Sequence, residues 1–176
     1  MQPALTEALS RWHDFYALIG TAAATLVGLM FVAASIGAGV FTRAHQAGIR
    51  SFLSPTVVHF SAVLLICLLA SAPTETWLSL GILLTGAGLI GLAYSVWIWR
   101  RMAMHGITPT IDVVDRLLYT MLPIAVYLVV TGAGLGLALR NGGSLNVLAV
   151  GLVLLLAIGI RNAWDMTVWI IDRHAK

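Results

Sequence analysis

The sequence predicts an all-α membrane protein, built as a polytopic bundle of five transmembrane helices. Of its 176 residues, 60% are hydrophobic and only 10% are charged, and the mean hydropathy is +0.95. Soluble domains carry about 25% charged residues. The apolar residues also form runs close to the length of about 20 residues that a helix needs to cross a bilayer. Little of the chain remains for a soluble catalytic domain.

Five apolar runs define the predicted spans. They cover residues 15–40, 51–72, 76–99, 113–139 and 145–171, with linkers at 42–50, 72–75, 100–112 and 140–144. The lipid phase permits only structures that satisfy every backbone polar group internally, namely helices and closed barrels. The alternating pattern of barrel strands is absent from these runs. All five are therefore expected to be helices.

The first 14 residues differ from these runs because they carry several charges, among them Glu7. Such charges interrupt the apolar core that a cleaved signal peptide requires, so no cleavage is expected. Leu5, Leu9 and Trp12 recur at intervals of four and three, which is the spacing of one helix face. Residues 1–14 are expected to form an amphipathic lead-in helix at the membrane interface.

The basic residues near the span ends predict the orientation. With five spans, one side receives Arg43, Arg50, Arg100, Arg101, Arg116, Arg161, Arg173 and Lys176, and the other receives only Arg11 and Arg140. Lysine and arginine accumulate on the cytoplasmic side of membrane proteins. The N-terminus is therefore predicted outside, with the transmembrane domain at 15–171 and a cytoplasmic tail at 172–176.

Small residues recur along one side of the first span. This small-residue stripe comprises Thr21, Thr25, Gly28, Val32 and Ser35. Small side chains let another helix approach closely, so a helix–helix contact is the favoured interpretation. The alternative is a pore lining in an oligomer, with hydroxyl groups facing ions. Similar rows of Gly81, Gly88 and Gly91 in the third span and Gly132 and Gly136 in the fourth favour packing as the general role of glycine here.

Polar and ionisable residues gather toward the predicted cytoplasmic side of three spans. This cytoplasmic polar cluster comprises His59, Asp115, Arg116, Tyr119, Arg161, Asn162 and Asp165. Arg161 and Asp165 are four residues apart, so they lie on one side of a helix and are expected to pair. The favoured interpretation is an arginine that reaches toward lipid phosphates beside its neutralising partner. The alternative is a vestibule or gate for an ion or small anion.

Two prolines lie inside predicted spans. Pro55 and Pro123 each remove one helical hydrogen bond, so irregular backbone is expected near the second and fourth cytoplasmic span ends.

Cofactor and enzyme chemistry are not expected. His59 is the only histidine deep in a span, and no two histidines have metal-ligand or haem-ligand spacing. Cys67, the single cysteine, lies in an apolar run and is expected to serve packing. No catalytic motif is present. The formal charge of +3 comes from scattered residues, so no nucleic-acid partner is expected.

Three segments carry a resemblance to a known group of proteins. They are HDFYALIGTAAATLVG at 13–28, PTVVHF at 55–60 and IRNAWD at 160–165. The chain resembles a family of small bacterial multi-pass inner-membrane proteins known only as an uncharacterised family. The resemblance covers most of the chain and implies a location in the bacterial inner membrane. It implies no activity.

The leading functional hypothesis is an oligomeric channel or small-solute permeation protein, since five helices of an 18.8 kDa subunit leave little interior for a private pathway. Its partners would be membrane lipids, further copies of the chain, and an ion or small solute. The alternative is a non-enzymatic scaffold or accessory subunit that docks through glycine-rich helix faces and presents basic loops to anionic lipid or a protein. A redox or lipid-modifying enzyme subunit is a third, less favoured hypothesis.

Overall fold

The computed structural model describes residues 3–40, 43–72, 76–104 and 117–174, and these ranges are almost wholly helical. The elements are α1 (Pro3–Val40), α2 (Arg43–Ala70), α3 (Trp77–Met104), the π-helical turn η2 (Leu117–Met121), α5 (Leu122–Ala138) and α6 (Ser144–His174). No strand occurs in these ranges. The predicted all-α class is therefore confirmed.

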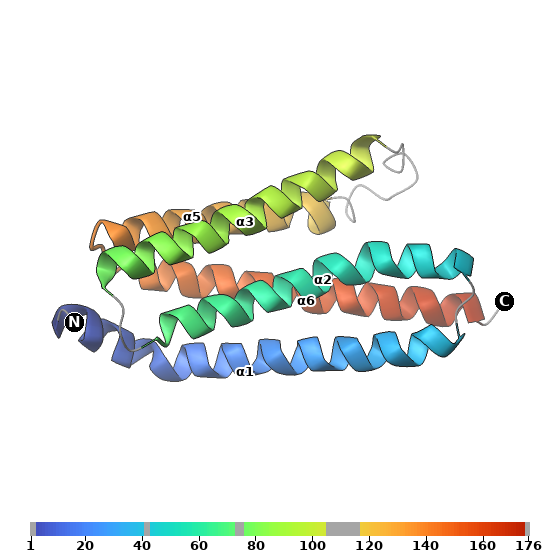
Figure 1. Ribbon diagram of the computed structural model, residues 1–176, viewed down its shortest axis with the longest axis horizontal. Coiled ribbons are helices and arrows are strands. Elements are labelled where there is room, and N and C mark those ends of the chain that lie inside the picture. Colours follow the sequence, from blue (N-terminus) through green and yellow to red (C-terminus); the bar gives the residue numbers. More distant parts are fainter. Residues whose placement is uncertain (1–2, 41–42, 73–75, 105–116, 175–176) are drawn as a thin grey trace.

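The long helices run alternately up and down in one elongated bundle (Figure 1). Helices α3 and α5 form the most closely packed pair. Helix α6 contacts α5 on one side and α2 on another, while α1 packs mainly against α2 at the edge of the bundle. The end of α2 and the starts of α1, α3 and α6 lie at the left of Figure 1.

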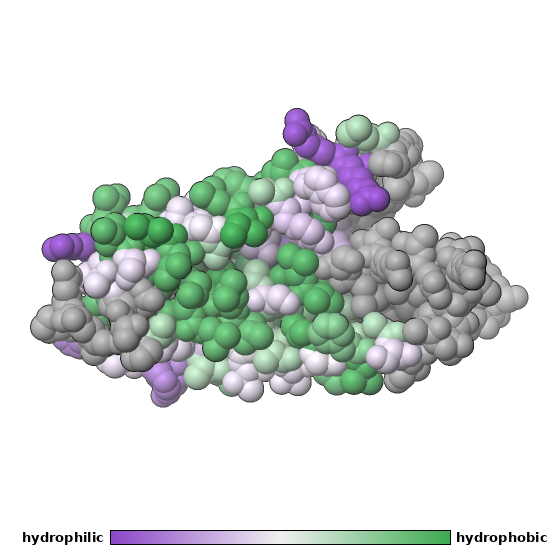
Figure 2. Space-filling model, in the orientation of Figure 1, coloured by the Kyte–Doolittle hydropathy of each residue, from purple (hydrophilic) through white to green (hydrophobic). Residues whose placement is uncertain are grey.

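Four helical segments are long and apolar enough to cross a membrane: Glu7–Ser35, Trp77–Met104, Tyr119–Ala138 and Ser144–Asp165. A shorter apolar segment, Pro55–Ala70, belongs to α2. In the face shown by Figure 2, hydrophobic side chains cover the middle of the bundle, and the most hydrophilic described residues lie away from it. The described chain therefore has the surface and the helices of a membrane-embedded protein.

The predicted turn at 140–144 is confirmed, whereas residues 73–75 of the predicted turn at 72–75 lie outside the described residues. At the start of α3, the Thr76 amide donates to Ser79 Oγ (2.9 Å) and the Ser79 amide donates to Thr76 Oγ1 (3.1 Å), which is a reciprocal N-terminal cap. After α5, Arg140 adopts a left-handed conformation with φ of 63°. The Arg140 and Asn141 amides donate to the carbonyls of Leu137 and Gly136, which closes the helix end.

Two boundary predictions were wrong. The predicted linker 42–50 is helical from Arg43, and α3 continues through Arg100 to Met104. Loss of apolar character ends a membrane span but does not end a helix, because charged residues are good helix formers and neither 43–50 nor 100–104 contains a proline. Both helices therefore extend beyond their apolar segments.

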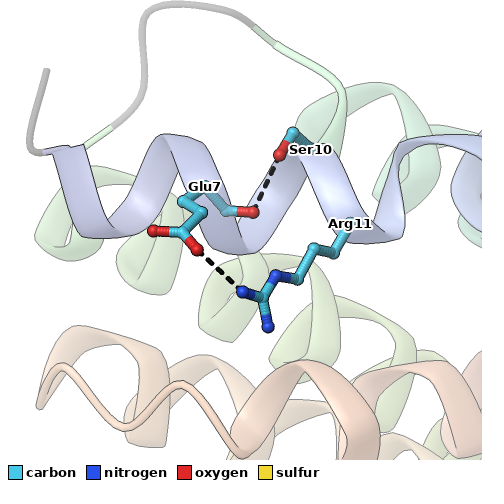
Figure 3. A network of polar contacts seen from close by, with 3 residues as sticks. All are labelled: Glu7, Ser10 and Arg11. Atoms are coloured by element: carbon cyan, nitrogen blue, oxygen red, sulfur yellow. Dashed lines mark hydrogen bonds and ion pairs between the residues drawn. The ribbon is translucent and has the colours of Figure 1, made fainter.

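The lead-in at the N-terminus is helical from Pro3 and continuous with the rest of α1. Leu5 is fully buried, and Leu9 and Trp12 pack against the core, so the predicted apolar face covers the bundle end. The opposite side is polar (Figure 3): Arg11 donates to Glu7 Oε1 at 2.7 Å, and Ser10 donates to the Glu7 carbonyl at 2.8 Å.

The core fills the centre of the bundle with large apolar side chains. Leu80, Leu84, Leu152 and Leu155 are completely buried together with several other residues of the core. Tyr16 of α1 is also buried and donates to the Leu145 carbonyl at 3.3 Å. Cys67 is buried beside Gly20, which agrees with the packing role expected for it. The described interior is predominantly apolar.

Candidate functional site

The small-residue stripe of α1 lies on the outside of the helix bundle. Thr21, Thr25, Gly28, Val32 and Ser35 are all exposed. At 100° per residue they cluster about half a turn from Ala23 and Met30, which are buried. Only 17% of the α1 span is buried, compared with 50% of the α6 span. Among the described residues, the stripe is therefore not a contact between helices of the chain.

The hydroxyl groups of the stripe donate their protons to their own helix. Thr21 donates to the Ala17 carbonyl at 2.7 Å, Thr25 to the Thr21 carbonyl at 2.9 Å, and Ser35 to the Phe31 carbonyl at 2.8 Å. Such back-bonding makes a hydroxyl tolerable in lipid. Because each proton is used in this way, the groups that the stripe exposes are hydrogen-bond acceptors, namely the hydroxyl oxygens.

Large apolar side chains flank the stripe. Leu18 and Leu29 are exposed on one side of it and Phe31 on the other, as the helical angle per residue requires. At Gly28, a Cβ atom would meet no heavy atom within 4 Å. A row of small residues between larger ones thus faces away from the rest of the described bundle.

The glycines of α3 and α5 behave in the opposite way. In this glycine seam, Gly81, Gly88, Gly91 and Gly134 are buried. A Cβ at Gly88 would lie 2.5 Å from Thr131 Oγ1 and 2.8 Å from the Thr131 amide nitrogen, and one at Gly134 would lie 2.5 Å from the Thr85 amide nitrogen. No side chain fits at these distances, so the seam brings two backbones into contact.

The packing role expected for glycine is therefore confirmed for the third span and only partly for the fourth. Gly91 makes room for the ring of Tyr127, and Gly136 contacts the Ser144 hydroxyl. Gly132 has nothing within 4 Å of its Cβ position, so the packing interpretation is wrong there. The seam residue that sequence reasoning missed on this helix is Gly134.

His59 of the cytoplasmic polar cluster is buried deep between helices. It is 2% exposed, and its Nδ1 lies 3.0 Å from the hydroxyl of Tyr127, which is fully buried. The two rings are tilted at 46° with centroids 5.6 Å apart. This bond joins α2 to α5 inside the apolar core. Tyr127 was missed, although a tyrosine in the middle of an apolar run needs a partner for its hydroxyl.

The predicted pairing on α6 is confirmed. Arg161 Nη2 lies 3.7 Å from Asp165 Oδ2, and both side chains are partly exposed. That distance is an ion pair but exceeds a hydrogen bond. Tyr119 is partly buried on η2. Asp115 and Arg116 lie outside the described residues.

Asn162, the next residue on α6, is the most unusual member of the cluster. It is 3% exposed, and neither Oδ1 nor Nδ2 has a hydrogen-bond partner among the residues that the structure describes. A buried amide without a partner costs about 1–3 kcal/mol. The structure thus places a strongly unsatisfied group in the half of the bundle that contains the His59–Tyr127 pair.

Irregular backbone occurs where Pro123 predicts it. The π-helical turn η2 precedes α5, whose first turn contains this proline. Single π-helical turns are rare and often mark functional sites. Pro55 lies inside α2, which remains continuous from Arg43 to Ala70.

No group of three or more histidine, cysteine, aspartate or glutamate side chains with the spacing for a metal ion lies within the described ranges. In comparisons with known proteins, no family model, no curated protein and no solved structure matches the chain. Functional inference therefore depends on the two features above, the small-residue stripe and the cytoplasmic polar cluster.

Proposed function

We propose that this chain is the subunit of a homo-oligomeric channel or small-solute permeation protein, in which copies assemble around a path lined by the small-residue stripe of α1. The observation that carries the proposal is the outward direction of this stripe. Thr21, Thr25 and Ser35 place polar groups on a surface that otherwise presents large apolar side chains such as Leu18 and Phe31.

Packing of the subunit supports a path between copies. The described interior is occupied by fully buried leucines and aromatic rings, and the α3–α5 backbones touch. A permeant species would need polar groups at several depths. On the outer face of α1, hydroxyls recur over about 21 Å from Thr21 to Ser35, at about 1.5 Å per residue.

The hydroxyl hydrogen bonds favour a small cation or a neutral solute as the permeant species. Each proton is committed to a carbonyl of the same helix, so the stripe offers acceptors. Oxygen acceptors replace the hydration shell of a cation in other pores. An anion would find no donor in these three groups.

In the proposed assembly each subunit crosses the membrane five times, with α2 as the fifth span, the N-terminus outside and the C-terminus cytoplasmic. The apolar segment Pro55–Ala70 is part of a helix that begins at Arg43. At about 1.5 Å per residue, α2 is therefore long enough to cross the bilayer. Arg100 and Arg101 then lie on the cytoplasmic side, as the distribution of basic residues requires. The location proposed is the bacterial inner membrane, and no catalytic activity is proposed.

Ion or solute flux into liposomes tests this function. Thr25→Cys in a Cys67→Ala background should be modified by a charged, water-soluble thiol reagent, and modification should block flux. Leu29→Cys is the matched control, because it is exposed on α1 beside the stripe; its modification should be slow and without effect on flux. If neither cysteine reacted with the reagent, the proposal that water reaches the stripe would be contradicted.

A scaffold or accessory subunit is the second candidate. The absence of any heavy atom within 4 Å of a Gly28 Cβ suits a partner helix that packs directly on the stripe. In that arrangement Thr25→Cys would be dry and flux absent, whereas a cysteine cross-link between neighbouring helices would form readily.

A further inference from the structure

We propose that the junction of α2, η2 and α6 is a binding site for water, held by the Asn162 amide and extending to the His59–Tyr127 pair. This inference does not depend on the proposed permeation path, which lies on the outer face of α1. It concerns the half of the bundle in which α3 and α6 end.

The first observation is the state of Asn162. Its side chain is almost completely buried, with both polar atoms lacking partners in the described part of the chain. Buried polar groups in proteins are nearly always hydrogen-bonded to protein or to ordered water. An amide both donates and accepts, so its partner must do the same.

The second observation is the neighbourhood of Asn162. One turn earlier on the same face of α6, Gly159 packs against the ring of Phe60 on α2. The two helices are antiparallel (Figure 1), so Asn162 lies near the level of Thr56, about one turn from His59. Thr56 is buried as well. Thr120 of η2, which contacts α6, is also buried.

The chemistry of these side chains indicates which ligand the site binds. The buried groups here are an amide, hydroxyls, an imidazole and a phenol, and the charged pair beside Asn162 on α6, Arg161 and Asp165, neutralises itself. Asp165 Oδ2 is itself buried and makes no hydrogen bond with described residues. Among these described groups a charged ligand would find no free counter-charge, whereas water donates and accepts and needs only two to four polar partners. The geometry therefore points to water entering beside the Arg161–Asp165 pair.

Radiolytic hydroxyl labelling of the unmodified protein in nanodiscs tests this site, because bound water generates hydroxyl radicals next to buried side chains. Tyr127 and Tyr16 form a matched pair: both are at most 1% exposed, and each forms a hydrogen bond through its hydroxyl, Tyr127 with His59 at 3.0 Å and Tyr16 with the Leu145 carbonyl at 3.3 Å. Tyr127 should be labelled several-fold faster than Tyr16. Equal, slow labelling of both would overturn the proposal.

The variant Asn162→Leu then tests the role of the amide. It should lower the labelling of Tyr127 to that of Tyr16, while Asn162→Ser, which retains a donor and acceptor, should keep most of the difference. Unchanged labelling of Tyr127 in a folded Asn162→Leu protein would overturn the assignment of Asn162. If Asn162→Leu fails to fold, the comparison of the two tyrosines in the unmodified protein still decides whether water is present.

Discussion

The glycine seam and the small-residue stripe contain similar residues but have opposite environments. In the seam, Gly88 and Gly134 bring the backbones of α3 and α5 into contact, whereas Gly28 in the stripe has no neighbour within 4 Å of a Cβ position. Small residues therefore permit close approach without specifying the partner. The seam joins two helices of the chain, whereas the stripe faces outward from the bundle.

The largest expected effect is on stability in the seam. Gly88→Val should lower the free energy of unfolding by about 1–3 kcal/mol, because its side chain would overlap Thr131 of α5. Gly132→Val is the matched control on the same helix pair, since its Cβ meets nothing; it should change stability by no more than about 0.5 kcal/mol. Denaturation in mixed detergent micelles measures both, and equal losses would contradict the assignment of the seam.

A second stability effect concerns the link from the seam to α2. Gly91 makes room for Tyr127, whose hydroxyl meets His59. Tyr127→Phe should cost about 1–3 kcal/mol, since it leaves a buried imidazole nitrogen without its partner. Adding His59→Phe should cost less than in the unmodified protein, because the two residues form one interaction. Full additivity in the double-mutant cycle would show that the hydrogen bond contributes nothing.

The stripe should respond through assembly instead of folding. Gly28→Leu should leave the helical content and monomer stability unchanged, because the new side chain points away from the subunit. Because the copies enclose a narrow path, a leucine from every copy at this depth should crowd the path and raise the dissociation constant of the oligomer at least about tenfold, or ~1.4 kcal/mol. Single-molecule subunit counting over a dilution series measures this change. Unaltered assembly would place the stripe outside the subunit contact and its path.

The smallest effects distinguish the threonines of the two regions. Thr131 is buried in the seam and donates to the Tyr127 carbonyl at 2.8 Å, whereas Thr25 is exposed with the same type of bond at 2.9 Å. Thr131→Val should cost about 1 kcal/mol through its lost bond, and Thr25→Val should lie within about 0.5 kcal/mol of the unmodified protein. Thermal unfolding of the two variants in one detergent compares their stabilities directly. A larger loss of stability for Thr25→Val would contradict the assignment of Thr131 as buried and Thr25 as exposed.

The positions of the helices were largely predictable because apolar run length and turn residues act locally. The turn at 140–144 separates α5 from α6 at the expected place, and Pro123 predicts the irregular turn η2. The Arg161–Asp165 pair was predictable for the same reason, since four-residue spacing alone brings the groups together.

The directions of the helix faces were not predictable in the same way. In a membrane protein, side chains that face lipid and side chains that face the core are both apolar, so periodicity does not separate them. Gly132 and Gly134 show the difficulty: they are two residues apart on α5, yet only Gly134 meets another helix. The partners of His59 and the burial of Asn162 depend on contacts between distant segments, which one sequence does not encode locally.

Native mass of the purified chain in nanodiscs or a mild detergent tests the central claim, that copies of the chain assemble around a path lined by the small-residue stripe. The account predicts a single closed oligomer of defined subunit number for the unmodified protein, and smaller species for Gly28→Leu under the same conditions. A monomeric unmodified protein would contradict the shared path between copies.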